Sequence, residues 1–580
     1  MKLKRIAAAC ALAIAILLGV KAEACTNFLF TKGATKDGST MITYAADSHV
    51  LYGELYYRRV ADYPEGTMFM LYDWDSGRKL FEIPQVAHTY NVVGNMNEHQ
   101  LAIGETTYGG REECWKGEIR GIDYGSLIYV TLQRAKNARE AIYWMTKLVA
   151  DYGYCSEGES FSICDPNEVW ILEMQAKRSE PVKADLAKKL KYQYKDGAVW
   201  VARRIPDGYV SGHANQARIT TFPQEVKKSF KAISSNNIAK HINDKELECV
   251  YAADVITYAR ACGWYEGTDA DFDFSAAYCP LTFSGIRACD ARVYAMFNRV
   301  NGSMKQYEKY AMGDPSAERM PLWIVPDHKV DLREAMSLMR DHYEGTAMDM
   351  TRDPGAGPFA CPYRWRPMSW EIDGKKYIHE RATSTQQTGF SFVAQCRSWM
   401  PDKVGGILWF GVDDTYSTCY CPMYCGITDI PLCFREGNGS MTQYSETAAF
   451  WLFNRVSNFV YSRYKDMIVD LQKVQSNLEK GFIDEVAKMD NKAKSLTDDK
   501  ALTAELNRFC GRQASHMMQQ WNELDRYLLV KYMDGNIKKE EDGHFKTTAT
   551  GGCASPDMPR YPDSFYRQIV REHGNVIRER

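Results

Sequence analysis

Residues 22–30 read Ala-Glu-Ala-Cys-Thr-Asn-Phe-Leu-Phe, and the rest of the chain is interpreted from this stretch. Ala22-Glu23-Ala24 matches the small-residue pattern of a signal-peptidase site, so cleavage there would make Cys25 the first residue of the mature protein. Cys25 would then carry both a thiol and a free α-amino group. An α-amine has a reference pKa of about 7.7–8.0 and a thiol one of about 8.5, so the amine can take the thiol proton near neutral pH.

The segment before Cys25 has the pattern of a secretory leader. Lys2, Lys4 and Arg5 form a basic start, and residues 6–20 form an apolar run. A membrane-spanning helix needs about 20 apolar residues, and no second run of this kind follows. We therefore expect an exported protein, periplasmic or extracellular, without stable membrane insertion.

A lipid-anchored surface binding protein is the alternative interpretation of the same cysteine. Lipoprotein leaders carry Leu or a similar residue three positions before the cysteine and small residues between, and Glu23 fits this pattern poorly. Lipoproteins also tend to continue into a polar tether, whereas residues 26–30 are strand-like. The pattern favours an unmodified Cys25.

Composition limits the classes of partner. The chain has 580 residues and a net charge of −2, with Lys+Arg 72 balanced by Asp+Glu 74. This balance provides no basic surface for nucleic acid, so we expect no nucleic-acid partner. The chain is longer than one hydrophobic core usually organises, which predicts two substructures or one elaborated domain. A homo-oligomer is compatible with the sequence.

Cysteines are numerous in this chain. After Cys10 in the leader and Cys25 are set aside, an odd number of the 17 remains. The densest group has no CxxC pair and no nearby histidine, which favours a disulfide-stapled loop over a zinc site; it consists of Cys419, Cys421, Cys425 and Cys433. We expect neither a metal nor a cofactor.

Residues 25–46 predict a β-hairpin with its turn signal at Asp37-Gly38. A turn at this position brings Cys25 opposite residues 47–50. Asp47 is therefore expected beside the new terminus, where its carboxylate could hold the α-amine in position. The alternative is that Asp47 is an ordinary turn residue at the end of a strand.

The following segments mix strands and helices. Residues 91–104 predict strand, turn and strand, with a loop that can approach a ligand at residues 105–110. Residues 124–152 have helical periodicity, and residues 161–173 predict a hairpin turned at Asp165-Pro166-Asn167. This order predicts an α+β protein built in layers.

The chain changes character towards its end. From Thr447 to about Tyr532 it is helix-like and free of proline, which predicts long helices packed on the main body. The tail from Asn536 is polar and predicts a surface extension.

Several motifs together resemble the cysteine Ntn-hydrolase dipeptidases of the dipeptidase A type. They spread over roughly residues 25 to 300 and comprise Cys25-Thr26-Asn27-Phe28, Asp37-Gly38-Ser39, Ala45-Ala46-Asp47-Ser48-His49, Asn95-Met96-Asn97-Glu98, Asp165-Pro166, residues 200–209 and residues 215–219. The resemblance implies an Ntn-hydrolase αββα sandwich with a helical C-terminal extension. The implied division is a signal peptide at 1–24, a dipeptidase domain at 25–446, and a helical region with a polar tail at 447–580.

The resemblance also implies a function and a set of site residues. It implies hydrolysis of dipeptides by the Cys25 nucleophile through a thioester intermediate. An acyl-amide hydrolase related to penicillin and bile-salt acylases is the alternative enzyme. Asn215 matches an asparagine that donates into the oxyanion hole of those acylases, and its alternative role is a helix or turn cap. Asp47 matches the carboxylate that orients the amine. Arg292 is a candidate match for a further active-site arginine, or an ordinary surface or ion-paired arginine.

The chain departs from the acylase pattern in two places. Tyr44-Ala45-Ala46 replaces the stretch in which the acylases have a basic residue, and Thr106 stands near the position of their second oxyanion asparagine. A backbone N–H or a hydroxyl would have to serve there. His49 and His213 lie close to the other site residues in sequence, but papain-type signatures are missing and the α-amine makes a histidine base unnecessary. We expect both histidines to serve in packing or substrate contact.

Overall fold

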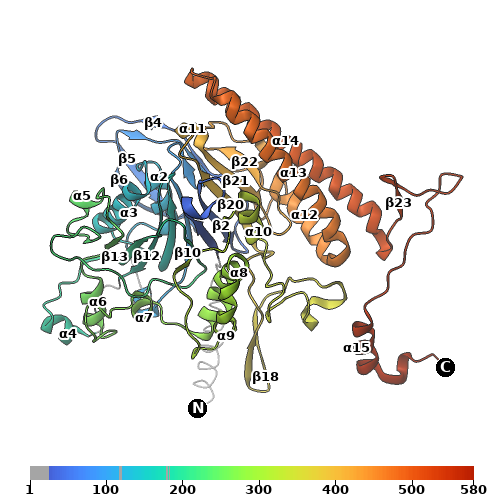
Figure 1. Cartoon of the computed structure of the whole chain (residues 1–580), viewed down its shortest axis with the longest axis horizontal. Coiled ribbons are helices and arrows are strands. Elements are labelled where there is room, and N and C mark those ends of the chain that lie inside the picture. Colours follow the sequence, from blue (N-terminus) through green and yellow to red (C-terminus); the bar gives the residue numbers. More distant parts are fainter. Residues whose placement is uncertain (1–24, 116–119, 178–180, 182, 580) are drawn as a thin grey trace, which may run out of the picture.

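The structure, a computed structural model, describes residues 25–115, 120–177, 181 and 183–579. The predicted leader lies outside the described residues. Two β-sheets form the centre of the molecule, and helices contact both of them (Figure 1). Among the described residues, no helix combines the length and the apolar character needed to cross a bilayer.

The first sheet contains the N-terminal hairpin. It has seven antiparallel strands in the order β17 (Trp323–Ile324), β14 (Val210–His213), β1 (Asn27–Phe30), β2 (Thr40–Asp47), β20 (Thr388–Cys396), β21 (Gly406–Val412) and β22 (Cys421–Tyr424). Every residue of β1, β2, β20 and β21 is buried, which indicates that this sheet is covered on both faces.

The second sheet packs against the first, because β2 contacts both β10 and β11. Its nine strands follow the order β15 (Ala232–Ser234), β16 (Cys249–Tyr251), β13 (Ala198–Arg204), β12 (Val169–Ala176), β11 (Gly158–Cys164), β10 (Ala102–Thr107), β9 (Met96–Asn97), β8 (Val92–Val93) and β3 (Tyr57–Arg58). The pairing is antiparallel except between β15 and β16.

Helices cover the two sheets. The second sheet contacts α2 (Tyr124–Leu132), α3 (Ala138–Tyr152) and α6 (Val255–Cys262). The first sheet contacts α8 (Ala291–Val300), α10 (Leu332–Leu338), α11 (Asp402–Gly405), α12 (Ala449–Ser462), α13 (Tyr464–Ala493) and α14 (Asp499–Tyr532). The other helices of the described residues are α4 (Ala184–Lys189), α5 (Ile238–His241), α7 (Phe274–Tyr278), α9 (Glu308–Ala311) and α15 (Asp563–His573).

Small antiparallel ribbons lie outside the two sheets. They are β4 (Ala61–Asp62) with β7 (His88–Thr89), β5 (Met68–Tyr72) with β6 (Lys79–Pro84), β18 (Ser369–Ile372) with β19 (Lys375–Ile378), and β23 (Glu540–Glu541) with β24 (His544–Phe545). The tail after α14 extends away from the body and carries α15 (Figure 1).

The structure confirms the α+β class and most of the predicted elements. The hairpin of β1 and β2, the hairpin of β11 and β12, and the long C-terminal helices are present. The predicted division at residues 446 and 447 stays a prediction, although α12 to α14 contact the first sheet directly.

Two predicted elements have different bounds. The helix predicted at residues 124–152 is two helices, α2 and α3. Asn137 is the N-cap of α3, because its side chain accepts a hydrogen bond from the Glu140 N–H. The loop predicted at residues 105–110 begins later, because Glu105, Thr106 and Thr107 complete β10 and pair with β11.

The predicted disulfide-stapled loop is wrong. The cysteines of this group are all free thiols; they are Cys419, Cys421, Cys425 and Cys433. The first three are fully buried at β22, under helices α13 and α14. They therefore act as small apolar side chains at a helix–sheet contact, a role that needs no cross-link.

Candidate active site

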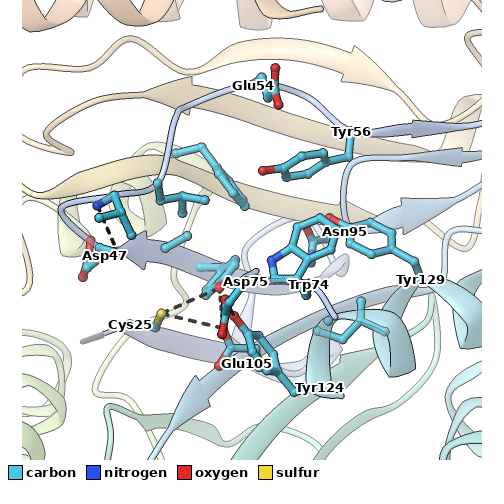
Figure 2. Close-up of a pocket in the computed structure, with 18 of the residues that line it drawn as sticks. Cys25, Asp47, Glu54, Tyr56, Trp74, Asp75, Asn95, Glu105, Tyr124 and Tyr129 are labelled. Carbon is cyan, nitrogen blue, oxygen red and sulfur yellow. Dashed lines mark hydrogen bonds between the residues drawn. The ribbon is translucent and has the colours of Figure 1, made fainter. Parts of the chain in front are cut away.

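Cys25 lies at the start of the N-terminal hairpin and at the wall of a cavity of about 370 Å³. The strand that follows it is held between β14 and β2, with Thr26 paired to Ala45. This register puts Cys25 opposite Ala46, one residue short of the predicted range that starts at Asp47. Both Cys25 and Asp47 line the cavity, so the predicted proximity is present (Figure 2).

The thiol of Cys25 faces two polar side chains. Its Sγ lies 3.7 Å from the Tyr44 hydroxyl and 3.7 Å from Glu105 Oε1 (Figure 2). Burial raises the pKa of the Cys25 thiol well above its ordinary value, and the carboxylates of Glu105 and Asp47 raise it further. The thiol is therefore protonated at neutral pH, and attack on a carbonyl requires a base that removes its proton.

Glu105 is held rigidly beside the thiol by the first sheet. The Asn27 side chain accepts a hydrogen bond from the Glu105 N–H at 3.0 Å and donates one to the Glu105 carbonyl at 3.1 Å. This approach requires a glycine at position 104, since a Cβ there would lie 2.7 Å from the side-chain amide of Asn27. The contact between β1 and β10, which belong to different sheets, thus fixes the Glu105 backbone.

The Glu105 carboxylate belongs to a buried acidic pair. The Tyr44 hydroxyl donates to it at 2.5 Å, and the buried Glu159 carboxyl group interacts with it electrostatically. Burial raises the pKa of Glu105 to about 7 and raises that of Glu159 as well.

Asp47 has an ion-pair partner that the sequence did not indicate. Its Oδ2 accepts a 2.5 Å hydrogen bond from Arg381, and its Oδ1 accepts one of 2.6 Å from Thr388. Burial raises the pKa of Asp47, while Arg381 opposes that shift. The backbone of Asp47 also hydrogen-bonds the Cys25 thiol and lowers its pKa. The main chain of Asp47 therefore contacts the Cys25 thiol, and the carboxylate of Asp47 contacts Arg381.

Arg292 connects the start of β1 with Asn215. Its guanidinium donates to the Cys25 carbonyl at 2.6 Å, to Thr26 Oγ1 at 2.7 Å and to Asn215 Oδ1 at 2.7 Å. The side chain is fully buried in α8. Arg292 is thus a buried structural anchor of the Cys25 backbone rather than an ordinary surface arginine.

Asn215 lies beside the site in an unusual backbone conformation. Its φ of 57° is left-handed, and its Nδ2 donates to the Thr107 carbonyl at 2.5 Å. The side chain therefore joins the end of β14 to the end of β10. This position brings Asn215 next to the site through Arg292 and Thr107, and its predicted oxyanion role stays a prediction.

Among the described residues, neither His49 nor His213 hydrogen-bonds the Cys25 thiol. His213 bonds Thr106 Oγ1 at 2.8 Å and Ser162 Oγ at 2.7 Å, so it joins the two sheets. Burial lowers the pKa of His213 to about 3 and keeps the ring neutral. The hydrogen bond to His213 therefore engages the Thr106 hydroxyl. His49 is exposed to solvent. The expectation of a packing role is confirmed for His213.

The cavity in front of Cys25 has aromatic and acidic walls. The aromatic side chains are Tyr44, Tyr56, Trp74, Tyr124, Tyr129 and Phe390. The acidic ones are Asp47, Glu54, Asp75, Glu105 and Glu436, against a single basic side chain, Arg58, which is paired with Glu436. Figure 2 shows Asp75 and Glu105 on the Cys25 side and Glu54 at the opposite end. Such a cavity favours a cationic ligand.

Sequence reasoning missed Tyr44, Glu105 and Arg381 as parts of the site. Glu105 gave the clearest signal, because a carboxylate directly follows the apolar stretch Leu101-Ala102-Ile103-Gly104 in a strand. Arg381 gave none, since it lies more than 300 positions from Asp47. Among the described residues, no group of three or more His, Cys, Asp or Glu side chains has the geometry of a metal site.

The sequence model of peptidase family C69 matches residues 24–477, so the chain belongs to this family. The match begins one residue before Cys25 and extends into α13. Two relatives are each 22% identical: a "Probable dipeptidase" of Latilactobacillus sakei, covering 79% of this chain and 86% of that protein, and a "Probable dipeptidase B" of Streptococcus pyogenes serotype M1, covering 82% and 85%. A "Probable dipeptidase" of Salmonella dublin is 21% identical, covering 71% and 83%.

Proposed function

We propose that this protein is an exported dipeptidase of the Ntn-hydrolase type, in which Cys25 becomes the N-terminal nucleophile. The position of Cys25 carries this proposal: it follows a cleavage motif, begins the central hairpin, and its thiol lies in an acidic cavity. The two packed sheets with helices on both are compatible with an αββα sandwich. The names of the relatives support dipeptides as substrates.

The proposed reaction uses the α-amine of Cys25 as its base. The amine accepts the thiol proton while sulfur bonds to the scissile carbonyl carbon. The protonated amine then gives this proton to the leaving nitrogen, the C–N bond breaks, and a thioester remains. Water attacks the thioester and loses a proton to the amine, the C–S bond breaks, and the N-terminal residue leaves with its new carboxyl group while the amine returns the proton to the Cys25 sulfur. The raised pKa of Cys25 supports the need for such a base.

The oxyanion of the tetrahedral intermediate requires hydrogen-bond donors. The Asp47 backbone N–H already faces the thiol, and the Asn215 side-chain amide, which matches the acylase position, is the proposed second donor. One such donor is typically worth about 2.7–4 kcal/mol in the transition state. Arg292 positions both Cys25 and Asn215 through its hydrogen bonds.

The burial of Cys25 favours this proposal over a lipid anchor. The residue is 6% exposed, and its thiol lies between Tyr44 and Glu105. A diacylglyceryl group on that sulfur would have to replace these contacts and fill the cavity.

The deciding experiment determines the mature N-terminus and the role of Cys25. Mass spectrometry of exported protein should show an unmodified Cys25 with a free amine. Cys25→Ala should abolish hydrolysis of dipeptides, and Cys25→Ser should slow it strongly. Exported protein that begins elsewhere, carries acyl groups on Cys25, or retains most activity as Cys25→Ala would contradict the proposal. Hydrolysis of acyl-amides in preference to dipeptides would favour the acylase alternative.

A further inference from the structure

The acidic wall next to the nucleophile suggests how the substrate is oriented. A scissile carbonyl carbon must come within about 3–3.5 Å of Cys25 Sγ before attack. In a dipeptide the α-nitrogen of the first residue is separated from this carbon by two bonds, about 2.5 Å. The α-nitrogen must therefore lie in the immediate surroundings of Sγ, whichever side chains the dipeptide carries.

Glu105 is the carboxylate within this range. Its Oε1 lies 3.7 Å from Cys25 Sγ, and Asp75 lies beside it at the cavity wall (Figure 2). Glu54 is at the far end of the cavity, and Asp47 faces Arg381. The Tyr44 hydroxyl at the thiol is a neutral donor already bonded to Glu105, so the Glu105 carboxylate is the charged side chain nearest the thiol.

A second, independent feature of the cavity also calls for a hydrogen-bond donor. Asn95 lines the cavity and is 3% exposed. Its Nδ2 donates to the Ile103 carbonyl at 2.8 Å, while its Oδ1 has no hydrogen-bond partner among the described residues. A buried acceptor without a partner costs about 1–3 kcal/mol. A ligand with N–H groups would relieve that cost.

We propose that Glu105, supported by Asp75 and Asn95, binds the free α-ammonium group of the substrate and thereby restricts the enzyme to peptides with an unblocked N-terminus. This inference rests on the proposed function and adds a specificity-determining residue to it. The aromatic walls add favourable contacts for a cation.

The test compares two substrates that differ only in the amine. Alanyl-alanine carries the ammonium group and propionyl-alanine lacks it, and kcat/KM is measured for both. Wild-type protein should prefer alanyl-alanine by on the order of 100-fold or more, since a site built to bind a polar group discriminates strongly against its absence. In Glu105→Gln this preference should fall by about 30-fold or more. Glu54→Gln, at the far end of the cavity, should change it by less than about threefold.

An additional measurement on the wild type covers the case in which Glu105→Gln does not fold. Alaninamide should protect Cys25 from alkylation by iodoacetamide, whereas propionamide at the same concentration should not. Equal protection by both amides, or an unchanged preference in folded Glu105→Gln, would overturn the inference. Failure of the proposed function looks different. In that case the wild type would hydrolyse neither substrate, or the Cys25→Ala variant would keep the activity of the wild type.

Discussion

The Tyr44 hydroxyl donates a 2.5 Å hydrogen bond to Glu105 Oε1, and this bond joins the two sheets beside the thiol. Tyr44 belongs to β2 and Glu105 to β10, so the contact depends on how the sheets pack. Tyr44 belongs to the stretch in which the acylases have a basic residue. A neutral donor at this position leaves the negative charge of Glu105 available for a cationic substrate.

Tyr44→Phe should weaken catalysis more than stability. The lost hydrogen bond normally lowers the pKa of Glu105, so the variant should keep Glu105 protonated to higher pH. We expect kcat/KM for alanyl-alanine at pH 7 to fall about 10-fold and the free energy of unfolding to fall by about 1 kcal/mol. Tyr63→Phe, outside the cavity, is the control. An unchanged kcat/KM between pH 6 and 8 would contradict the role of the hydroxyl.

Gly104→Ala should destabilise the protein by about 1–3 kcal/mol, measured by chemical denaturation. The new Cβ would lie 2.7 Å from the side-chain amide of Asn27 and would push β1 away from β10. Gly481→Ala is a matched control, because that glycine lies within α13 with open space around it and should stabilise the helix by about 0.5–1 kcal/mol. Equal effects of the two substitutions would show that the close approach is not required.

Asp47→Asn should destabilise the protein, because it leaves the buried Arg381 charge without its carboxylate, at a cost of about 3–5 kcal/mol. The double variant Asp47→Asn with Arg381→Met should recover much of that stability. If Asp47 also orients the α-amine, the double variant should remain poorly active. Recovery of both stability and kcat would restrict Asp47 to a structural role.

Glu105→Gln should stabilise the protein at high pH. The folded-state pKa of Glu105, about 7, is above that of an exposed glutamate, so protonation favours folding. This contribution is complete below about pH 4.5 and is lost as the pH rises through 7. Glutamine stays neutral, so the variant should match the wild type near pH 5 and exceed it by about 1–3 kcal/mol at pH 8.5. A difference in Tm that does not depend on pH would contradict the assignment.

The expected activity of the wild type falls on the acid side for two reasons. The α-amine of Cys25 must be neutral to accept the thiol proton, and Glu105 must be ionised to bind an ammonium group. The second requirement applies only to substrates with a free amine. The acid limb of kcat/KM should therefore be steeper for alanyl-alanine than for propionyl-alanine, and parallel limbs would argue against a separate role of Glu105.

Local sequence predicted the elements that depend on neighbouring residues. The Asp37-Gly38 turn set the hairpin of β1 and β2 to within one residue of its register, and Asp165-Pro166-Asn167 set the hairpin of β11 and β12. The helices from residue 449 to 532 followed from periodicity and the lack of proline. The break between α2 and α3 was missed because the cap at Asn137 interrupts a continuous apolar pattern.

What the sequence alone determined is therefore the position of Cys25 behind a cleavage motif, the hairpin that brings Asp47 to it, and the α+β class. Tertiary structure alone decided which groups surround the thiol: Glu105 from the second sheet, Arg381 from a distant loop, and the thiol state of Cys419, Cys421 and Cys425. Turn and helix patterns act over a few residues, whereas these contacts arise where two sheets pack, and their partners lie 80 to 334 positions apart.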